Sequence, residues 1–204
     1  MSRAFLRNRA AGLTIDSLLY GLSLYAVPIL IGIASLYAIV ALDSQYPFDG
    51  QRPIPFRVLE QAAVPLTPAD ALGLLERTAP VHQHDTKLSE SPFWLSFTAS
   101  PAGGGEATIV ELPSRPGTEI ECWNAERFST IGRADRGAGM GAVSMEKAGF
   151  AIELGRLTAE TTLLCRAGHA GPARITVLQW PDSQFGLSVQ KFHRNAGLLD
   201  GGLI

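Results

Sequence analysis

Cysteine is scarce in this sequence of 204 residues, and runs of like charge are missing. Only two cysteines are present, which excludes a small scaffold held together by many disulfides. Lysine and arginine number 17 against 19 aspartates and glutamates, and no basic cluster indicates nucleic acid binding. No residue stands in a nucleophile motif, and the Gly-rich stretch 132–141 is not followed by the Lys-Ser or Lys-Thr of a phosphate-binding loop. We therefore predict no nucleic-acid partner and no enzymatic activity.

One long apolar run stands out, residues 17–42, and it holds no charged residue. Its 26 residues would extend about 39 Å as a helix, against about 30 Å for the hydrocarbon core of a bilayer. We predict a transmembrane signal-anchor helix over 16–43, with a kink near Pro28. A cleavable signal peptide is the alternative, but its apolar region is normally much shorter.

The flanking charges predict the orientation of this helix. Arg3, Arg7 and Arg9 precede it, whereas the first basic residue after it is Arg52. Because positive residues stay in the cytoplasm, residues 1–15 are expected to form a cytoplasmic tail. The remainder would then lie in the periplasm of a bacterium, anchored in the inner membrane.

Residues 44–87 are predicted to be a linker that contains one short helix. Three prolines between residues 46 and 56 favour an extended chain. The helix is expected over 67–78, where Thr67 suits the N-cap and Pro68 the first helical position.

Residues 88–193 form the predicted main domain, which is mainly β because apolar and polar residues alternate with a period of two. The expected strands are 93–98, 107–112, 118–124, 150–154, 161–167, 173–180 and 185–193. The first two are predicted to form a hairpin, and 132–141 a mobile loop. Short strands separated by turns are typical of an antiparallel β-sandwich. The apolar ending, residues 194–204, is interpreted as the start of a second membrane helix.

The two cysteines, Cys122 and Cys165, lie in predicted strands. Cys122 shares a strand face with Ile120, and Cys165 shares one with Leu163. Both side chains are therefore expected in the core. They form either a disulfide, as an oxidising compartment would favour, or two buried free thiols.

The order of the strands resembles that of a known family. The segments that carry the resemblance are Ser91–Phe97, Thr118–Trp123, Phe150–Gly155, Thr162–Ala167 and Gly171–Ala173. Over roughly residues 88–190 the chain is similar to the periplasmic jelly-roll sensor domain of bacterial seven-transmembrane receptors with diverse intracellular signalling modules. Related input domains occur on membrane-bound diguanylate cyclases. One departure is the membrane anchor, which stands where that family usually has a cleaved signal peptide.

The resemblance implies a galactose-binding-like jelly-roll β-sandwich that serves as the sensory input module of a signalling receptor. Any cyclase or kinase output domain would lie beyond this chain. The expected partners are the membrane, a small ligand or periplasmic protein, and a second copy of the chain. The alternative is an envelope scaffold or protein-interaction module with a carbohydrate-binding-like sandwich.

Five residues are candidates for ligand binding. Arg133 and Arg136 lie in the Gly-rich stretch and can hold an anion by charge-assisted hydrogen bonds. Arg166 and His169 either form part of a concave polar patch or are simply solvated. Trp123, like the other strand tryptophans, either stacks against a sugar or is buried in the core.

No metal or other cofactor is predicted. His82 and His84 would face the same way on a strand, but a competent site needs three or four ligands. Glu119 and Glu121 also share a strand face, which is ordinary for exposed acids. The sequence therefore contains no convincing catalytic pair.

Overall fold

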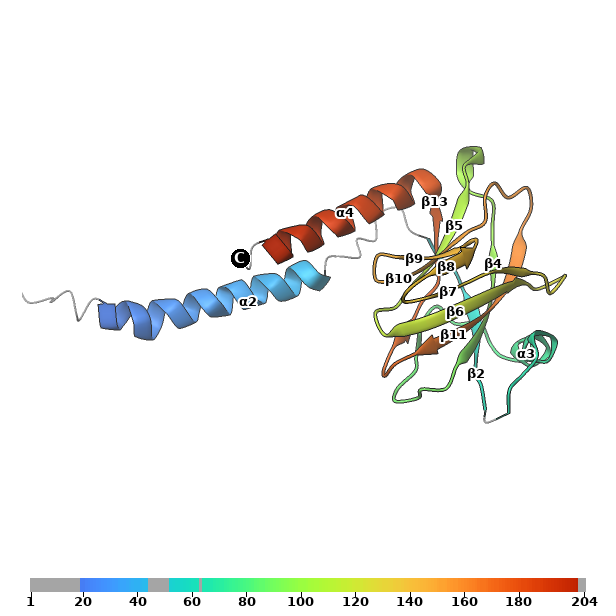
Figure 1. Ribbon diagram of the computed structural model, residues 1–204, viewed down its shortest axis with the longest axis horizontal. Coiled ribbons are helices and arrows are strands. Elements are labelled where there is room, and N and C mark those ends of the chain that lie inside the picture. Colours follow the sequence, from blue (N-terminus) through green and yellow to red (C-terminus); the bar gives the residue numbers. More distant parts are fainter. Residues whose placement is uncertain (1–18, 44–51, 63, 202–204) are drawn as a thin grey trace, which may run out of the picture. The chain divides into compact units, whose positions relative to one another are not determined.

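The computed structural model describes residues 19–43, 52–62 and 64–201, which fall into two compact units (Figure 1). The division lies between Pro47 and Phe48. The predicted tail, residues 1–15, lies outside the described residues, as do residues 44–51 of the predicted linker. Each unit is described by itself.

The first unit is one apolar helix, made of a π-helical turn η1 (Leu22–Ala26) followed by α2 (Val27–Asp43). Leu19–Tyr37 is long and apolar enough to span a membrane, by length and composition. The sequence predicts a kink near Pro28, and the structure has the π-helical turn η1 two residues before this proline. Proline has no N–H to donate to the carbonyl four residues earlier, and a wider turn accommodates its ring.

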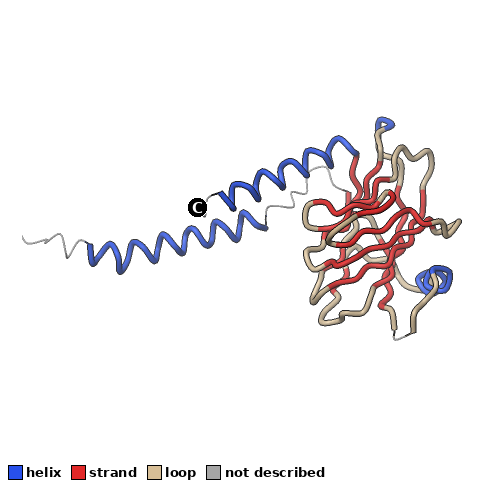
Figure 2. The backbone as a smooth tube through the Cα atoms, viewed as in Figure 1, coloured by secondary structure: helices blue, strands red, loops and turns tan. Residues whose placement is uncertain are grey.

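The second unit is mainly β and contains one large curled antiparallel sheet, shown by the strands in Figure 2. Its strands are β1 (Arg52–Pro53), β2 (Phe56–Glu60), β4 (Phe93–Ala99), β5 (Thr108–Pro113), β6 (Gly117–Asn124), β7 (Thr130–Asp135), β8 (Gly139–Gly141), β9 (Val143–Glu146), β10 (Gly149–Glu153), β11 (Thr161–His169) and β13 (Leu178–Pro181). Their order is β1-β13-β5-β10-β9-β8-β7-β6-β11-β4-β2. A separate pair joins β3 (His84–Asp85) to β12 (Arg174–Ile175), and η2 (Gly103–Gly105) is a short 3₁₀ turn.

The sheet curls until its two edges approach each other. β1 and β2 stand at opposite ends of the strand order, yet only Ile54 and Pro55 separate them in the chain. Ile54 is buried, and its N–H donates to the carbonyl of Val177 at 3.0 Å. The curl encloses a core of inward-facing side chains, among them Phe93 and Leu95.

Glycines permit the tightest part of the curl, where β7, β8 and β9 follow one another. A Cβ atom on Gly132 would lie 2.4 Å from the carbonyl oxygen of Met140, and Gly141 has a φ of +71°. A residue with a side chain would clash at position 132, and at position 141 it would be strained by the left-handed backbone. The prediction of a mobile loop over 132–141 is therefore wrong, because residues 132–135 and 139–141 are paired strands and only 136–138 form the turn between them.

Two helices cover parts of the outer face of the sheet. α3 (Pro68–Leu75) confirms the helix predicted after Thr67, whose Oγ1 accepts a hydrogen bond from the Asp70 N–H at 3.3 Å. Ala71 and Leu75 bury the helix against Trp94 of β4. α4 (Asp182–Gly201) packs its first turns on β13 and β5.

Three expectations about the strands are wrong. The predicted hairpin of residues 93–98 with 107–112 does not form, because β4 pairs with β11 and β2 whereas β5 pairs with β10 and β13. β2 lies in the predicted linker but is part of the sheet. Residues 185–193 are helical rather than extended, since apolar side chains recur there with helical spacing and pack against the sheet.

A disulfide joins Cys122 of β6 to Cys165 of β11. Of the two alternatives that the sequence leaves open, a disulfide or two buried free thiols, the structure therefore has the disulfide. The two residues are directly opposite in the antiparallel register, and both are fully buried in the inner core. The bridge closes a loop across a sequence separation of 43.

Reducing the Cys122–Cys165 disulfide should lower the free energy of unfolding by up to about 4 kcal/mol, because the unfolded chain regains the entropy of an open loop. Urea unfolding of the full chain in detergent, with and without reductant, measures the difference. The Cys122→Ala/Cys165→Ala variant is the control and should not respond to reductant. An unchanged transition of the wild-type protein on reduction would contradict the expectation.

Candidate functional site

A polar cavity of about 350 Å³ lies on the outer face of the sheet over β6, β7, β8 and β11. The strand register places its side chains in rows. Arg166 of β11 is opposite Glu121 of β6, Glu121 is opposite Arg133 of β7, and Arg133 is opposite Met140 of β8. The row thus alternates in charge and ends on an exposed methionine that supplies an apolar wall.

The next row of the cavity is acidic. Glu119 of β6 is directly opposite Asp135 of β7. Asp135 Oδ1 accepts the N–H groups of Gly137 and Ala138 at 2.7 and 2.9 Å. These backbone hydrogen bonds, helped by nearby Arg133, hold the pKa of Asp135 below its ordinary value. The two acids thus occupy directly opposite positions on neighbouring strands, where like charges normally destabilise a sheet, and the side chain of Glu119 lies beside Gly168 of β11.

Arg166 is the least satisfied member of the cavity. Its Nε is buried and has no hydrogen-bond partner among the described residues. Within the same part of the chain, no ion pair within 4.0 Å joins Arg166 or Arg133 to Glu121, although each is its cross-strand neighbour. Because this nitrogen is covered by protein, a molecule in the cavity would reach the guanidinium through its two Nη atoms.

The cavity brings together two of the five predicted ligand-binding residues, Arg133 and Arg166. Arg136 does not line it and instead donates its Nε–H to the Gly117 carbonyl at 2.7 Å. His169 lies three residues after Arg166 on β11 and faces the inner core, where its ring contacts Phe93. The prediction that Arg166 and His169 form one polar patch is therefore wrong.

The three strand tryptophans all lie on the outer face of the sheet and support the helices. Trp94 and Trp180 are each 2% exposed, in the clusters beneath α3 and α4 respectively. Trp123 is half-buried and stacks on Trp94, with ring centroids 5.5 Å apart. Trp94 and Trp180 are thus closed to a sugar, and Trp123 is committed in part to the same packing.

The two histidines considered as metal ligands do not gather further ligands. His84 belongs to β3, and its ring lies 5.7 Å from that of Phe93. Among the described residues, no group of three or more His, Cys, Asp or Glu is placed to hold a metal ion.

A buried polar network attaches α4 to the sheet. Lys147, in the turn between β9 and β10, pairs with Glu111 of β5 at 2.8 Å, and both side chains are 1% exposed. Trp180 Nε1 donates to the other Glu111 oxygen at 2.7 Å, and Lys147 Nζ contacts Ser188 Oγ of α4 at 2.9 Å. Lys147 also lies over the rings of Trp180 and Phe185. Burial raises the pKa of Glu111, whereas Lys147 and Trp180 favour its charged form.

Three acids of the cavity, Glu119, Glu121 and Asp135, and its exposed Met140 were not predicted as site residues from the sequence. The alternation in β6 places both glutamates on one face, but their neighbours on β7 and β11 depend on register. If Cys122 and Cys165 are taken as a cross-strand pair, Glu121 falls opposite Arg166 by counting. That signal was present in the sequence.

No protein-family model and no curated protein matches the chain. Its function is therefore argued from the cavity, the apolar helix and the attachment of α4.

The stability of the domain should fall as the pH drops below about 6.5, owing to His169. Burial lowers the pKa of this imidazole, and its Nδ1 has no partner in the described part of the chain. The unfolded chain therefore binds the proton first, and the loss levels off below the lowered pKa of the folded protein.

Melting temperatures of the full chain between about pH 8 and pH 5 test this expectation. His169→Gln should flatten the part of the profile below pH 6.5, whereas His193→Gln, at an exposed position on α4, should leave it unchanged. Equal slopes for the wild-type protein and His169→Gln would show that His169 is not responsible.

Lys147→Met should lower the free energy of unfolding by about 3–5 kcal/mol, because Glu111 would remain buried without its partner. The double variant Lys147→Met/Glu111→Gln should recover most of that loss. Lys191→Met, at an exposed lysine of α4, is the matched control and should change stability by less than about 0.5 kcal/mol. If Lys147→Met costs no more than Lys191→Met, the buried pair does not hold the helix.

Proposed function

We propose that this protein is a membrane-anchored sensory input module that binds a small ligand in the cavity over β6, β7, β8 and β11. The guanidinium of Arg166 carries the proposal: it lines the cavity together with that of Arg133, and neither has an ion pair among the described residues. A binding pocket of this size with a few convergent polar groups is a common form of ligand site. A ligand acceptor would pair with these two positive charges.

Anchoring and orientation follow from the N-terminal part of the chain. Leu19–Tyr37 is the membrane span, and Arg3, Arg7 and Arg9 keep the N-terminus in the cytoplasm. The β domain then lies in the periplasm of a bacterium. The Cys122–Cys165 disulfide supports this placement, because disulfides persist in oxidising compartments.

The fold assignment within this proposal is a galactose-binding-like jelly roll, as the resemblance to periplasmic sensor domains implies. The strand connections support it. β4 and β5 are consecutive in the chain but pair with distant strands, as Greek-key connections require. The curled sheet with a filled interior is likewise compatible with a jelly roll.

The route from ligand to membrane is short. Met140 lines the cavity and Lys147 contacts α4, and only Gly141 at the end of β8, the connecting residue Ala142 and β9 come between them. The C-terminal part of α4, residues 194–201, belongs to the stretch proposed as the start of a second membrane helix. The strands β8 and β9 would need two alternative positions for this route. A ligand that binds more tightly to one of them would favour that position and so change how α4 packs on the sheet.

A screen for ligands of the full chain in detergent micelles tests the proposal. Small metabolites of several classes, including amino acids, sugars, carboxylates and phosphate esters, are added singly and the melting temperature is recorded. A ligand at a hundred times its Kd should raise the melting temperature by about 5–10 °C. Arg166→Gln should abolish the rise.

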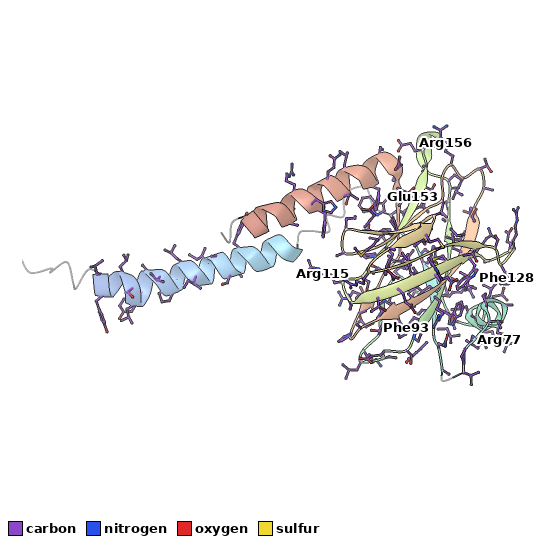
Figure 3. The ribbon with its side chains drawn as sticks, in the orientation of Figure 1. Arg77, Phe93, Arg115, Phe128, Glu153 and Arg156 are labelled. Carbon is purple, nitrogen blue, oxygen red and sulfur yellow. A yellow bond between two sulfur atoms is a disulfide. The ribbon has the colours of Figure 1, made fainter. Side chains whose placement is uncertain are left out.

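Arg156→Gln is the matched control, because Arg156 is exposed in the loop after β10 and does not line the cavity (Figure 3). It should retain the response. If no compound in the screen binds and one fixed protein partner co-purifies with the chain, the proposal of a sensory module is wrong. The alternative, an envelope scaffold, then explains the result.

A further inference from the structure

We infer that the ligand of this cavity is a small zwitterion, with a carboxylate for the arginines and an ammonium group for the acids, as in an α-amino acid. This inference rests on the proposed ligand-binding function and adds the charge pattern of the ligand. Two separate observations lead to it, one on each row of the cavity.

The first row requires an anion. Arg166 and Arg133 flank Glu121 across the strands, so two guanidinium groups share a single carboxylate. No ion pair within 4.0 Å joins Glu121 to either arginine in the described structure, so the Nη atoms of both remain to be paired. A carboxylate is the planar acceptor that matches a guanidinium group.

The second row requires a cation. Glu119 and Asp135 are directly opposite on neighbouring strands, and the backbone N–H groups of Gly137 and Ala138 keep Asp135 ionised. In the part of the chain that the structure describes, neither Glu119 nor Asp135 has an ion pair with a basic side chain. An ammonium group between the two carboxylates would remove their repulsion.

The spacing of the rows limits the size of the ligand. Alternate residues of a strand have Cα atoms about 7 Å apart, so the arginine row and the acidic row are neighbours in the sheet. A small molecule can therefore reach side chains of both rows, and the cavity of about 350 Å³ leaves room for a side chain beside Met140.

The charge balance argues against other ligands. The lining has three acids, Glu119, Glu121 and Asp135, and two arginines, so a phosphate with two negative charges would meet net repulsion. A neutral sugar would satisfy Arg166 but leave the Glu119–Asp135 repulsion in place. A zwitterion alone complements both rows.

The test uses the full chain in detergent micelles and the twenty proteinogenic L-amino acids as probes, with the melting temperature and calorimetric titration as readouts. At least one amino acid should bind. Its deaminated acid and its decarboxylated amine should each bind roughly ten- to a hundredfold more weakly, because each leaves one row unpaired. Inorganic phosphate should not compete.

Variants separate the two rows. Arg166→Gln and Glu119→Gln should each weaken binding of that amino acid about tenfold or more, whereas Arg156→Gln and Glu153→Gln, at exposed positions labelled in Figure 3, should not change it. Glu119→Gln should also raise the melting temperature of the ligand-free protein by about 1–2 °C, since it removes the like-charge pair. A residue with a purely structural role would not give opposite changes in stability and affinity.

Three results would overturn the inference: equal binding of the deaminated acid, competition by phosphate, or no binding of any amino acid. If a sugar or a dicarboxylate binds instead and Arg166→Gln abolishes that binding, the proposed ligand-binding function stands and the zwitterion fails. If no compound of any class binds, both fail together.

Discussion

The bridge between Cys122 and Cys165 is the constraint on which the arrangement of the outer face depends. It joins directly opposite residues of β6 and β11, and in an antiparallel pair one fixed contact sets every other. A slip of one residue would turn each strand's apolar side chains outward. The bridge therefore fixes both the buried inner core and the position of Arg166 opposite Glu121.

The outer face divides into two covered regions and one open region. α3 covers the region around Trp94, and the first turns of α4 cover the region around Trp180. Between them, β6, β7 and β8 carry charged side chains that no helix covers, and the cavity lies there. The tryptophans that could have stacked against a sugar instead pack beneath the helices, whereas the charged strands stay open to solvent.

Charged side chains behave in opposite ways in these regions. Under α4, Lys147 and Glu111 are buried and their charges are matched by an ion pair, a hydrogen bond from Trp180 and a contact with Ser188. In the cavity, Arg133 and Arg166 have no ion pair among the described residues. Charges that are paired in the interior hold one structure together, whereas unpaired charges at a surface are available to a ligand.

The sequence by itself determined the features that depend on near neighbours: the apolar helix, the cap of α3 at Thr67, and the alternation of most strands. It also contained the information that Arg166 and His169, three residues apart on one strand, face opposite ways, although they were predicted to act together. Only the tertiary structure decided that β4 and β5 pair with distant strands, that α4 is a helix, and that Glu119 meets Asp135. These depend on which segments pair and pack across the fold, and such contacts have no local signature because packing overrides local preference.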